Sequence, residues 1–341
     1  MAGAGVVRRW GGLSGDVDLL DSVPLDSGGL LRRGTLLAAG FGRDEIDRLV
    51  RAGRLVGIRP GVYRLPGDAE PTRTELHRIR AQAAAPELAA DAVYGGVTAA
   101  VLLGLPLWRV PLGRLHVFRD RPGGGRIRPG THVHAVPLPD RDVVDVGGLR
   151  VTSVARTAVD LARTLTTEQA LVTLDAALHR YVRRDPTLPP PPGAVDPAQL
   201  DDVLGRFAGR RGAPRARRAM DLVDERTESP GESRSRFHLH AAGLPAPMTQ
   251  WEVPGLGYRT DFAWPGHGVV GEFDGRIKYG RTLRPGEDLE DVLWREKRRE
   301  DRIRSTGLIM VRWIWSDIDD RGPDGMVPRL SRLLAVLPHP T

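Results

Sequence analysis

The sequence predicts a multidomain protein of mixed α/β (α+β) class, and three observations support that prediction. A chain of 341 residues can form two or three domains, and 40% hydrophobic with 27% charged residues is ordinary for a globular protein. Apolar residues recur at helical spacing in some segments and alternate, as they do in strands, in others. The run LPPPPGAVDP, from Leu188, is stiff and disfavours a helix, so it separates an earlier from a later part of the chain.

The first predicted domain spans residues 28–67 and follows a loose lead-in. The segment from Leu30 to Leu65 predicts a short helix, a glycine-marked turn, a second helix and two strands that turn at Pro60-Gly61. Together these elements make a winged helix-turn-helix, in which the second helix enters the DNA major groove and the hairpin lies along the backbone. The alternative is a small packing domain whose arginines are only solvated. The arginines expected to contact DNA are Arg43, Arg48, Arg51, Arg54 and Arg59.

The second predicted domain, residues 68–187, mixes helices with short strands such as LHVF and HVHAV. On one of these strands His132 and His134 can share a face, but no third ligand is apparent nearby, so we expect no metal site there. Arg156 and Asp160 are spaced for an ion pair on a helix surface. The expected helices are Thr74 to Ala85, Ser153 to Leu165 and Thr167 to Tyr181.

Residues 188–227 are expected to be a linker, first proline-rich and then arginine-rich. The segment GRFAGRRGAPRARRAM contains no acidic residue. Such a run either binds phosphates or is merely solvated, and the sequence leaves both alternatives open. Its arginines are Arg206, Arg210, Arg211, Arg215, Arg217 and Arg218.

The net charge of +7 and the pI near 10.4 favour a polyanionic partner, and nucleic acid is the first candidate. The absence of cysteine excludes disulfides and thiolate metal sites. The N-terminus lacks an unbroken apolar signal segment, and the longest apolar stretch, AAVLLGLPLW, is too short and is broken by proline. We therefore expect a cytoplasmic protein with no membrane partner.

The last predicted domain, residues 228–320, has the most distinctive pattern. A helix capped by Ser229 comes first, followed by the strand candidates TQWEV, YRTDFAW and HGVVGEF. A helix from about Glu287 to Arg304 and a last strand, GLIMVRWIW, complete the domain. The predicted order is helix, three strands, helix, strand.

Carboxylates of this domain are expected to converge. Because side chains alternate along a strand, Glu272 and Asp274 project to one side, and Asp261 on the preceding strand lies opposite them in a suitable register. Gathering these groups is unfavourable unless a cation neutralises them, and Mg²⁺ (or Mn²⁺) selects such oxygen ligands. A bound metal can activate water and stabilise charge during attack on a phosphodiester. The pattern therefore indicates nuclease chemistry.

Three further residues belong to this hypothesis. The only two lysines of the chain, Lys278 and Lys297, are both placed to approach the carboxylates, where a lysine would orient water or stabilise developing negative charge. Glu232 is alternatively a capping-box residue of the helix that begins after Ser229. Asp274, which precedes a glycine, is alternatively a turn residue.

The series Glu232, Asp261, Glu272-Phe273-Asp274-Gly275, a helix and VRWIW ending in Asp317 resembles the PD-(D/E)XK nuclease superfamily, in its very-short-patch-repair-like endonuclease branch. The resemblance covers about residues 228–320 and implies a restriction-endonuclease-like α/β fold with a mixed central sheet. It also implies that Asp261, Glu272 and Glu232 bind the metal. Where the superfamily pattern expects a lysine, this sequence has Asp274, so Lys278 or Lys297 takes that role or the role is absent.

The front of the chain, about residues 28–180, resembles the AbiEi-type antitoxin architecture, with TSVARTAVDLA from Thr152 as the signature of its middle domain. Our leading hypothesis is a DNA-binding protein with a metal-dependent endonuclease-like domain. The alternative is a non-catalytic transcriptional regulator of antitoxin type with a degenerate nuclease domain, and a third interpretation is a protein-interaction scaffold. The expected partners are DNA, a toxin or defence-system protein, and a second copy of the chain as a homodimer.

Overall fold

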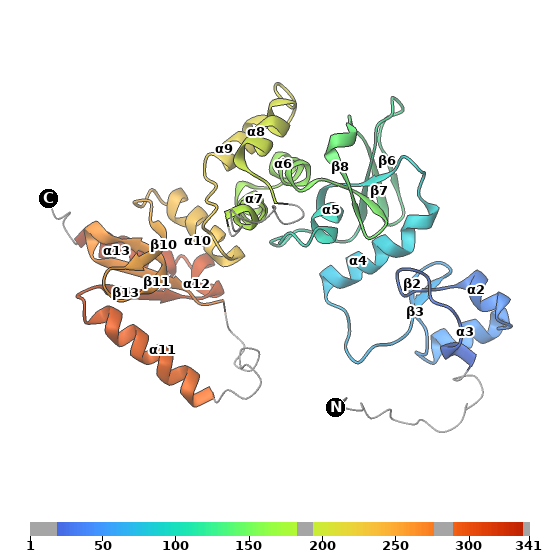
Figure 1. Ribbon diagram of the computed structural model, residues 1–341, viewed down its shortest axis with the longest axis horizontal. Coiled ribbons are helices and arrows are strands. Elements are labelled where there is room, and N and C mark those ends of the chain that lie inside the picture. Colours follow the sequence, from blue (N-terminus) through green and yellow to red (C-terminus); the bar gives the residue numbers. More distant parts are fainter. Residues whose placement is uncertain (1–18, 183–193, 276–288, 337–341) are drawn as a thin grey trace. The chain divides into compact units, whose positions relative to one another are not determined.

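The computed structural model describes residues 19–182, 194–275 and 289–336, and Figure 1 draws the other residues as a thin grey trace. The chain divides into two compact units, residues 1–92 and residues 93–341, and each is described by itself. Both units combine helices with sheets, so this is a mixed α+β protein, as the sequence predicts. Among the described helices, none is both long and apolar enough to cross a membrane.

Helices and short strands alternate in the first unit, in the order β1 (Leu31–Arg32), α2 (Arg33–Ala38), α3 (Arg43–Arg51), β2 (Val56–Arg59), β3 (Val62–Arg64) and α4 (Arg73–Ala84). The strands form an antiparallel sheet with the order β1-β3-β2. Helices α2 and α3 share a buried core with Phe41, Leu55 and Tyr63. Ala83 of α4 is buried against Leu30 and Val62. Helix α4 therefore belongs to the first unit, although the sequence placed it in the middle domain.

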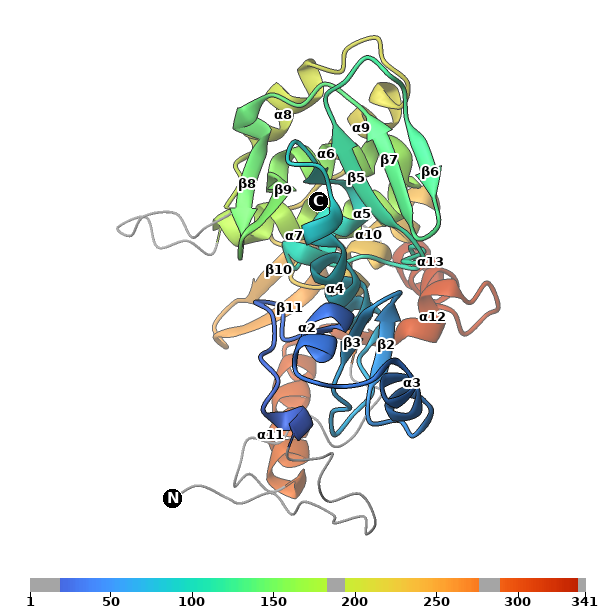
Figure 2. The ribbon, with the colours of Figure 1, turned by 90° about the vertical axis from the view of Figure 1, so that its right-hand side faces the viewer.

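The second unit opens with a mixed six-stranded sheet whose strands lie side by side in the order β6-β7-β5-β4-β9-β8 (Figure 2). The pairs β5-β7 and β4-β9 are parallel, and the remaining pairs are antiparallel. The strands are β4 (Val93–Tyr94), β5 (Leu115–Arg119), β6 (Arg126–Arg128), β7 (Thr131–Ala135), β8 (Val143–Val146) and β9 (Leu149–Thr152).

Five helices of this part share one hydrophobic core: α5 (Gly96–Leu102), α6 (Val154–Thr164), α7 (Thr167–Val182), α8 (Pro197–Gly205) and α9 (Ala213–Met220). Helices α8 and α9 fall within residues 188–227, which the sequence analysis treated as a linker. Leu200, Val203, Leu204 and Phe207 follow helical spacing, and all are buried in this core. The described part of the expected linker, residues 194–227, is therefore an integral part of the middle domain.

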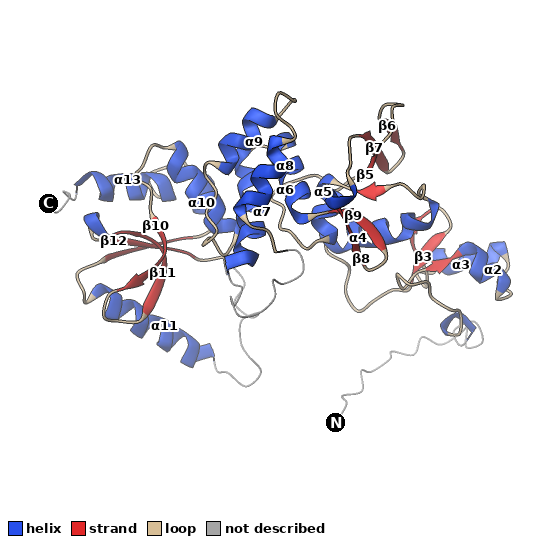
Figure 3. Ribbon diagram, turned by 45° about the horizontal axis from the view of Figure 1, so that its top comes forward, coloured by secondary structure: helices blue, strands red, loops and turns tan. Residues whose placement is uncertain are grey.

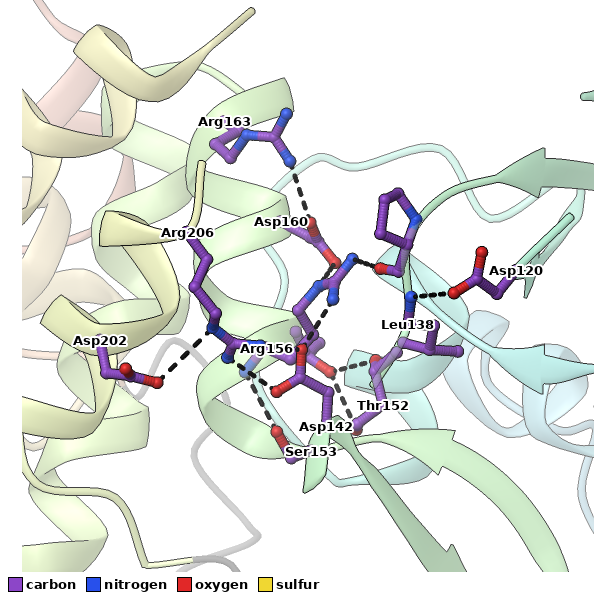
Figure 4. Close-up of polar contacts among 12 residues, drawn as sticks. Asp120, Leu138, Asp142, Thr152, Ser153, Arg156, Asp160, Arg163, Asp202 and Arg206 are labelled. Atoms are coloured by element: carbon purple, nitrogen blue, oxygen red, sulfur yellow. Dashed lines mark hydrogen bonds and ion pairs between the residues drawn. The ribbon is translucent and has the colours of Figure 1, made fainter. Parts of the chain in front are cut away.

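A buried ion network fixes α6 and α8 against the start of β8 (Figure 4). Arg156, only 2% exposed, donates to Asp142 at 2.7 Å and to Asp160 at 2.8 Å. Arg206, at the end of α8, donates both of its terminal nitrogens to Asp142. The predicted pair of Arg156 and Asp160 is thus formed, but it lies in the interior and not on the helix surface.

The C-terminal part of the second unit is a four-stranded sheet with the order β10-β11-β12-β13. The pairs β10-β11 and β11-β12 are antiparallel, and the pair β12-β13 is parallel, so the sheet is mixed. The strands are β10 (Met248–Val253), β11 (Tyr258–Trp264), β12 (Val269–Phe273) and β13 (Ile309–Trp313). The helices are α10 (Pro230–Ala241), α11 (Leu289–Arg304), α12 (Trp315–Asp319) and α13 (Met326–Val336).

Helices cover both faces of this sheet (Figure 3). Residues of α10, α12 and α13 form one buried cluster with Phe262 and Trp313, and Ile303 of α11 belongs to a second cluster with Val270. Gly271 permits this packing, because a Cβ atom there would lie 2.5 Å from the ring of Trp313. The sheet is therefore a layer between helices, and its strand ends position the side chains considered next.

The two parts of the second unit contact each other through α7 and α10. Arg234 of α10, 1% exposed, donates to Glu168 of α7 at 2.6 Å and pairs with Asp319. Its guanidinium lies 4.0 Å from the ring centroid of Trp108, and that ring stacks on Trp315. This buried arginine therefore joins the middle domain to the C-terminal sheet domain.

Candidate functional site

Helix α3 places arginines on the surface of the first unit. Ile46 and Leu49 face the core and are 0% and 5% exposed. The side chains of Arg43, Arg48 and Arg51 are exposed. Helical spacing sets Arg48 and Arg51 on the side away from Ile46. The helix is anchored by its apolar stripe, so its opposite side can approach a partner.

Acidic residues of α3 are partly engaged by the fold. Glu45 accepts a hydrogen bond from the backbone N–H of Gly42 at 3.0 Å, which caps the helix start. Asp47 pairs with Arg33 of α2 at 3.5 Å. Neither contact uses Arg43 or Arg48.

The remaining two predicted arginines are placed differently. Arg54 follows α3 and is half-exposed. Arg59 of β2 donates to Glu87 at 2.7 Å and to the backbone oxygen of Ala83 at 3.5 Å, so its charge is already compensated within the unit. The hairpin therefore offers less free positive charge than α3.

Asp261 lies on β11 of the C-terminal sheet, beside β12. The register pairs Phe262 of β11 with Gly271 of β12, and one step further places Asp261 opposite Glu272 on the same face. Asp261 Oδ2 accepts a hydrogen bond from the backbone N–H of Phe273 at 2.8 Å. Burial, followed by the negative charges of Glu232 and Glu272, raises the pKa of Asp261 to about 7.

Glu272 is neutralised by two arginines. Its Oε1 accepts a hydrogen bond from Arg299 of α11, and its Oε2 lies 3.1 Å from Arg312 of β13. Neither arginine is among the site residues predicted from the sequence. For Arg299 a signal existed, because it precedes the buried Ile303 by four residues and so shares the helix face turned to the sheet.

Glu232 is buried at the start of α10 and makes several hydrogen bonds. It accepts from the Ser229 hydroxyl at 2.6 Å, from the Glu228 N–H at 3.0 Å and from Gln250 at 2.9 Å. Burial raises its pKa above the usual value. Glu232 thus caps the helix and also contributes its charge to the surroundings of Asp261.

The other predicted site residues are exposed or lie outside the described residues. Asp274 is exposed after the end of β12, and its backbone N–H donates to Trp313 at 2.8 Å. Lys297 is exposed, with its nitrogen 5.5 Å from the ring centroid of Trp294. Lys278 lies outside the described residues. The group that reaches Glu272 from α11 is therefore Arg299 and not a lysine.

As arranged here, the three acids do not fit a hard divalent cation. Both oxygens of Glu272 are engaged by arginines, and both oxygens of Glu232 accept hydrogen bonds. Within the described part of the chain, two groups offer three ligand atoms within 4.8 Å of one another. One is His116, His132 and His134, and the other is Glu168, His238 and Asp319. In the second group Arg234 already supplies the positive charge.

Two known protein families match segments of the chain between residues 19 and 224. Residues 19–66 match a family described as transcriptional regulator, AbiEi antitoxin. Residues 92–224 match the AbiEi antitoxin C-terminal domain. The second match includes α8 and α9, in agreement with their place in the core of the middle domain.

Two curated relatives come from Mycobacterium tuberculosis, "Uncharacterized protein MT2308" of strain CDC 1551 / Oshkosh and "Uncharacterized protein Rv2248" of strain ATCC 25618 / H37Rv. Each is 30% identical over 303 residues, which cover 86% of this chain and 97% of the relative. A solved structure, the crystal structure of RV2827C protein from Mycobacterium tuberculosis, has 21% identity and a TM-score of 0.38. That match covers 61% of this chain and 76% of the other.

Proposed function

The chain carries both AbiEi antitoxin domains and belongs to one family with the two Mycobacterium tuberculosis relatives, and on this premise we propose that it is a DNA-binding transcriptional regulator of antitoxin type. In this proposal the first unit is a winged helix-turn-helix. Helix α3 is its recognition helix, and the β2-β3 hairpin is its wing (Figure 1).

The observation that carries the proposal is the two-sided character of α3. Ile46 and Leu49 hold one side in the core, while Arg43, Arg48 and Arg51 are exposed. Arginine suits both phosphate contact and bidentate recognition of guanine in the major groove. Since Arg59 is paired with Glu87, we assign the wing a weaker, backbone-directed role.

The test is DNA binding by the full chain and by matched arginine variants. Fluorescence anisotropy with a labelled duplex from the region upstream of its own gene would give the affinity across a salt series. Arg48→Ala and Arg51→Ala should each weaken binding by about 5- to 100-fold. The slope of the logarithm of the binding constant against the logarithm of the salt concentration should become less negative by about one for each phosphate contact that is lost.

Arg217→Ala on α9 is the control, because Arg217 is also exposed but pairs with Asp201 at 2.7 Å in the middle domain. Its affinity for the duplex should equal that of the wild type. Equal binding by wild type and the Arg43, Arg48 and Arg51 triple variant would overturn the assignment of α3.

The proposal includes protein partners for the regulator. A toxin or defence-system protein follows from the AbiEi antitoxin domains, and a homodimer would let two copies of α3 meet two half-sites of an operator. Light scattering on the free chain and on its DNA complex would measure the number of copies. A single copy on a saturated duplex would remove the homodimer from the proposal.

A second candidate function is phosphodiester hydrolysis that depends on Mg²⁺ or Mn²⁺. The observation in its favour is the gathering of Asp261, Glu272 and Glu232, with the pKa of Asp261 raised to about 7. It requires Arg299 and Arg312 to release Glu272. Incubation of plasmid DNA with the chain and either metal would decide: nicking by wild type that is lost in Asp261→Ala supports it, and absence of nicking removes it.

A further inference from the structure

Three histidines meet on one face of the six-stranded sheet of the middle domain. His132 and His134 are two residues apart on β7 and therefore project to the same side. His116 of β5 is the direct partner of His132 in the parallel register. Cross-strand partners also project to the same side, so all three side chains share it. The neighbouring strands β5, β7 and β6 are visible in Figure 2.

We propose that His116, His132 and His134 form a binding site for one divalent transition-metal ion, with Zn²⁺ as the physiological occupant. One ring nitrogen of each histidine lies within 4.8 Å of the corresponding nitrogens of the other two. Nδ1 of His116 and Nε2 of His134 are 3.0 Å apart. Imidazole nitrogens bound to one tetrahedral zinc at about 2.0 to 2.1 Å lie roughly 3.3 Å from one another. Binding one ion requires the three ring nitrogens, which now lie within 4.8 Å of one another, to turn toward a common centre.

Ring packing holds the three imidazoles together in advance. The rings of His132 and His134 stack with their centroids 3.8 Å apart and their planes inclined by 28°, and the centroids of His116 and His134 are 5.1 Å apart. The backbone N–H of His116 donates to Thr98 Oγ1 of α5 at 2.8 Å, which fixes the strand behind its ring. The ligands are thus positioned by the sheet, and metal binding orders few additional groups.

Positive charge close to the rings would repel a metal ion, so the direction of the neighbouring arginines matters for this site. The strand β6 faces His132 with Ile127, while Arg126 pairs with Val133 on the opposite side of the sheet. The arginines of β6 are therefore directed away from the three rings.

The ligand set selects the metal. Three imidazole nitrogens suit Zn²⁺, Cu²⁺ or Ni²⁺, whereas Mg²⁺ requires oxygen ligands. All three histidines are only partly buried, so water can reach the metal and fill the fourth position. A bound zinc would join β5 to β7 and close the chain segment between them. The three histidines lie in the middle domain, for which we propose no DNA contact.

The test is metal titration of tag-free full chain that has first been treated with a chelator. Calorimetry with Zn²⁺ should show one ion per chain. Co²⁺ should produce the visible absorption of a tetrahedral complex, because nitrogen ligands in that geometry give intense d-d bands. His116→Ala and His134→Ala should each lower the Zn²⁺ affinity by at least about 100-fold, since each removes a direct ligand.

His240→Ala is the matched control, because it removes an exposed histidine from α10 and leaves the cluster intact. His132→Gln removes the third ligand and should also weaken Zn²⁺ binding. A circular dichroism spectrum equal to that of the wild type would show that this weakening does not come from unfolding. Absence of saturable Zn²⁺ binding overturns the proposal. So does binding that survives replacement of all three histidines, or that is lost in His238→Ala at the other ligand group.

Discussion

Two clusters of carboxylates in the second unit are stabilised in opposite ways. Around Arg156 the two acids differ: although burial opposes ionisation, Arg206 and Arg156 hold the pKa of Asp142 below its usual value, whereas burial raises the pKa of Asp160 despite its bond to Arg156. Around Asp261 burial and two neighbouring acids raise the pKa to about 7, and the nearby arginines contact Glu272 instead. In the first cluster Arg156 bonds to both acids and so links separate elements, whereas in the second cluster the arginines bond to Glu272 and the surroundings of Asp261 disfavour its charged form.

The largest effect that this comparison predicts is at the cluster around Arg156. Arg156→Met leaves Asp142 and Asp160 buried without their shared partner, so the free energy of unfolding should fall by about 3 to 5 kcal/mol. Urea unfolding followed by tryptophan fluorescence reports on the second unit, because six of the seven tryptophans follow residue 92. Arg217→Met removes an exposed pair and should change stability by less than about 0.5 kcal/mol. A loss at Arg156 as small as that of the control would contradict a structural role for the network.

Removing the charge of Asp261 should have the opposite effect and raise the free energy of unfolding. The raised pKa means that the native state holds the proton more tightly than the unfolded state, so stability should fall as pH rises from about 4 to about 7. Asp261→Asn stays neutral and retains an oxygen for the Phe273 N–H. It should be more stable than wild type by about 1 to 3 kcal/mol near pH 8 and equal to it near pH 4.

Urea unfolding in the presence of a chelator would measure this pH dependence. Asp324→Asn removes the same charge from an exposed position in the same unit, and we expect little change there. If Asp261→Asn were instead less stable near pH 8, the native state would favour the carboxylate. That outcome is what a cation-binding site requires, and it would strengthen the second candidate function.

Features that depend on local spacing could be predicted from the sequence. The alternation of strand side chains gave the expected juxtaposition of Asp261 and Glu272, and helical spacing gave the pair of Arg156 and Asp160. The order of helix, three strands, helix and strand in the C-terminal part also agrees with the structure.

Features that depend on distant contacts could not be predicted in the same way. His116 precedes His132 by sixteen residues, and only the parallel pairing of β5 with β7 brings them together. The role of Arg312 follows from the register of β13 against β12, which a single sequence does not specify. The proline-rich run suggested a linker, but the apolar stripe of α8 buries that helix in the middle-domain core.

The smallest predicted effect is at Glu168, whose pKa is lowered, as is that of Asp142. Burial opposes ionisation there too, but His238 and Arg234 hold the pKa of Glu168 at about 2. Its stabilising contribution is fully present above about pH 4.5 and is lost as pH falls toward 2. Because the group is partly exposed to screening solvent, Glu168→Gln should cost only about 1 to 2 kcal/mol at neutral pH.

Glu168 and Asp261 together predict the shape of the pH profile of the second unit. Glu168 stabilises it above about pH 4.5, and Asp261 destabilises it as pH rises toward 7, so stability should be greatest near pH 5. Glu168→Gln should flatten the acidic side of the profile, and Asp261→Asn should flatten the neutral side. The two residues have separate partners, so the double variant should show the sum of both changes. A maximum at neutral pH, or a double variant that departs from additivity, would mean that the two clusters are not independent.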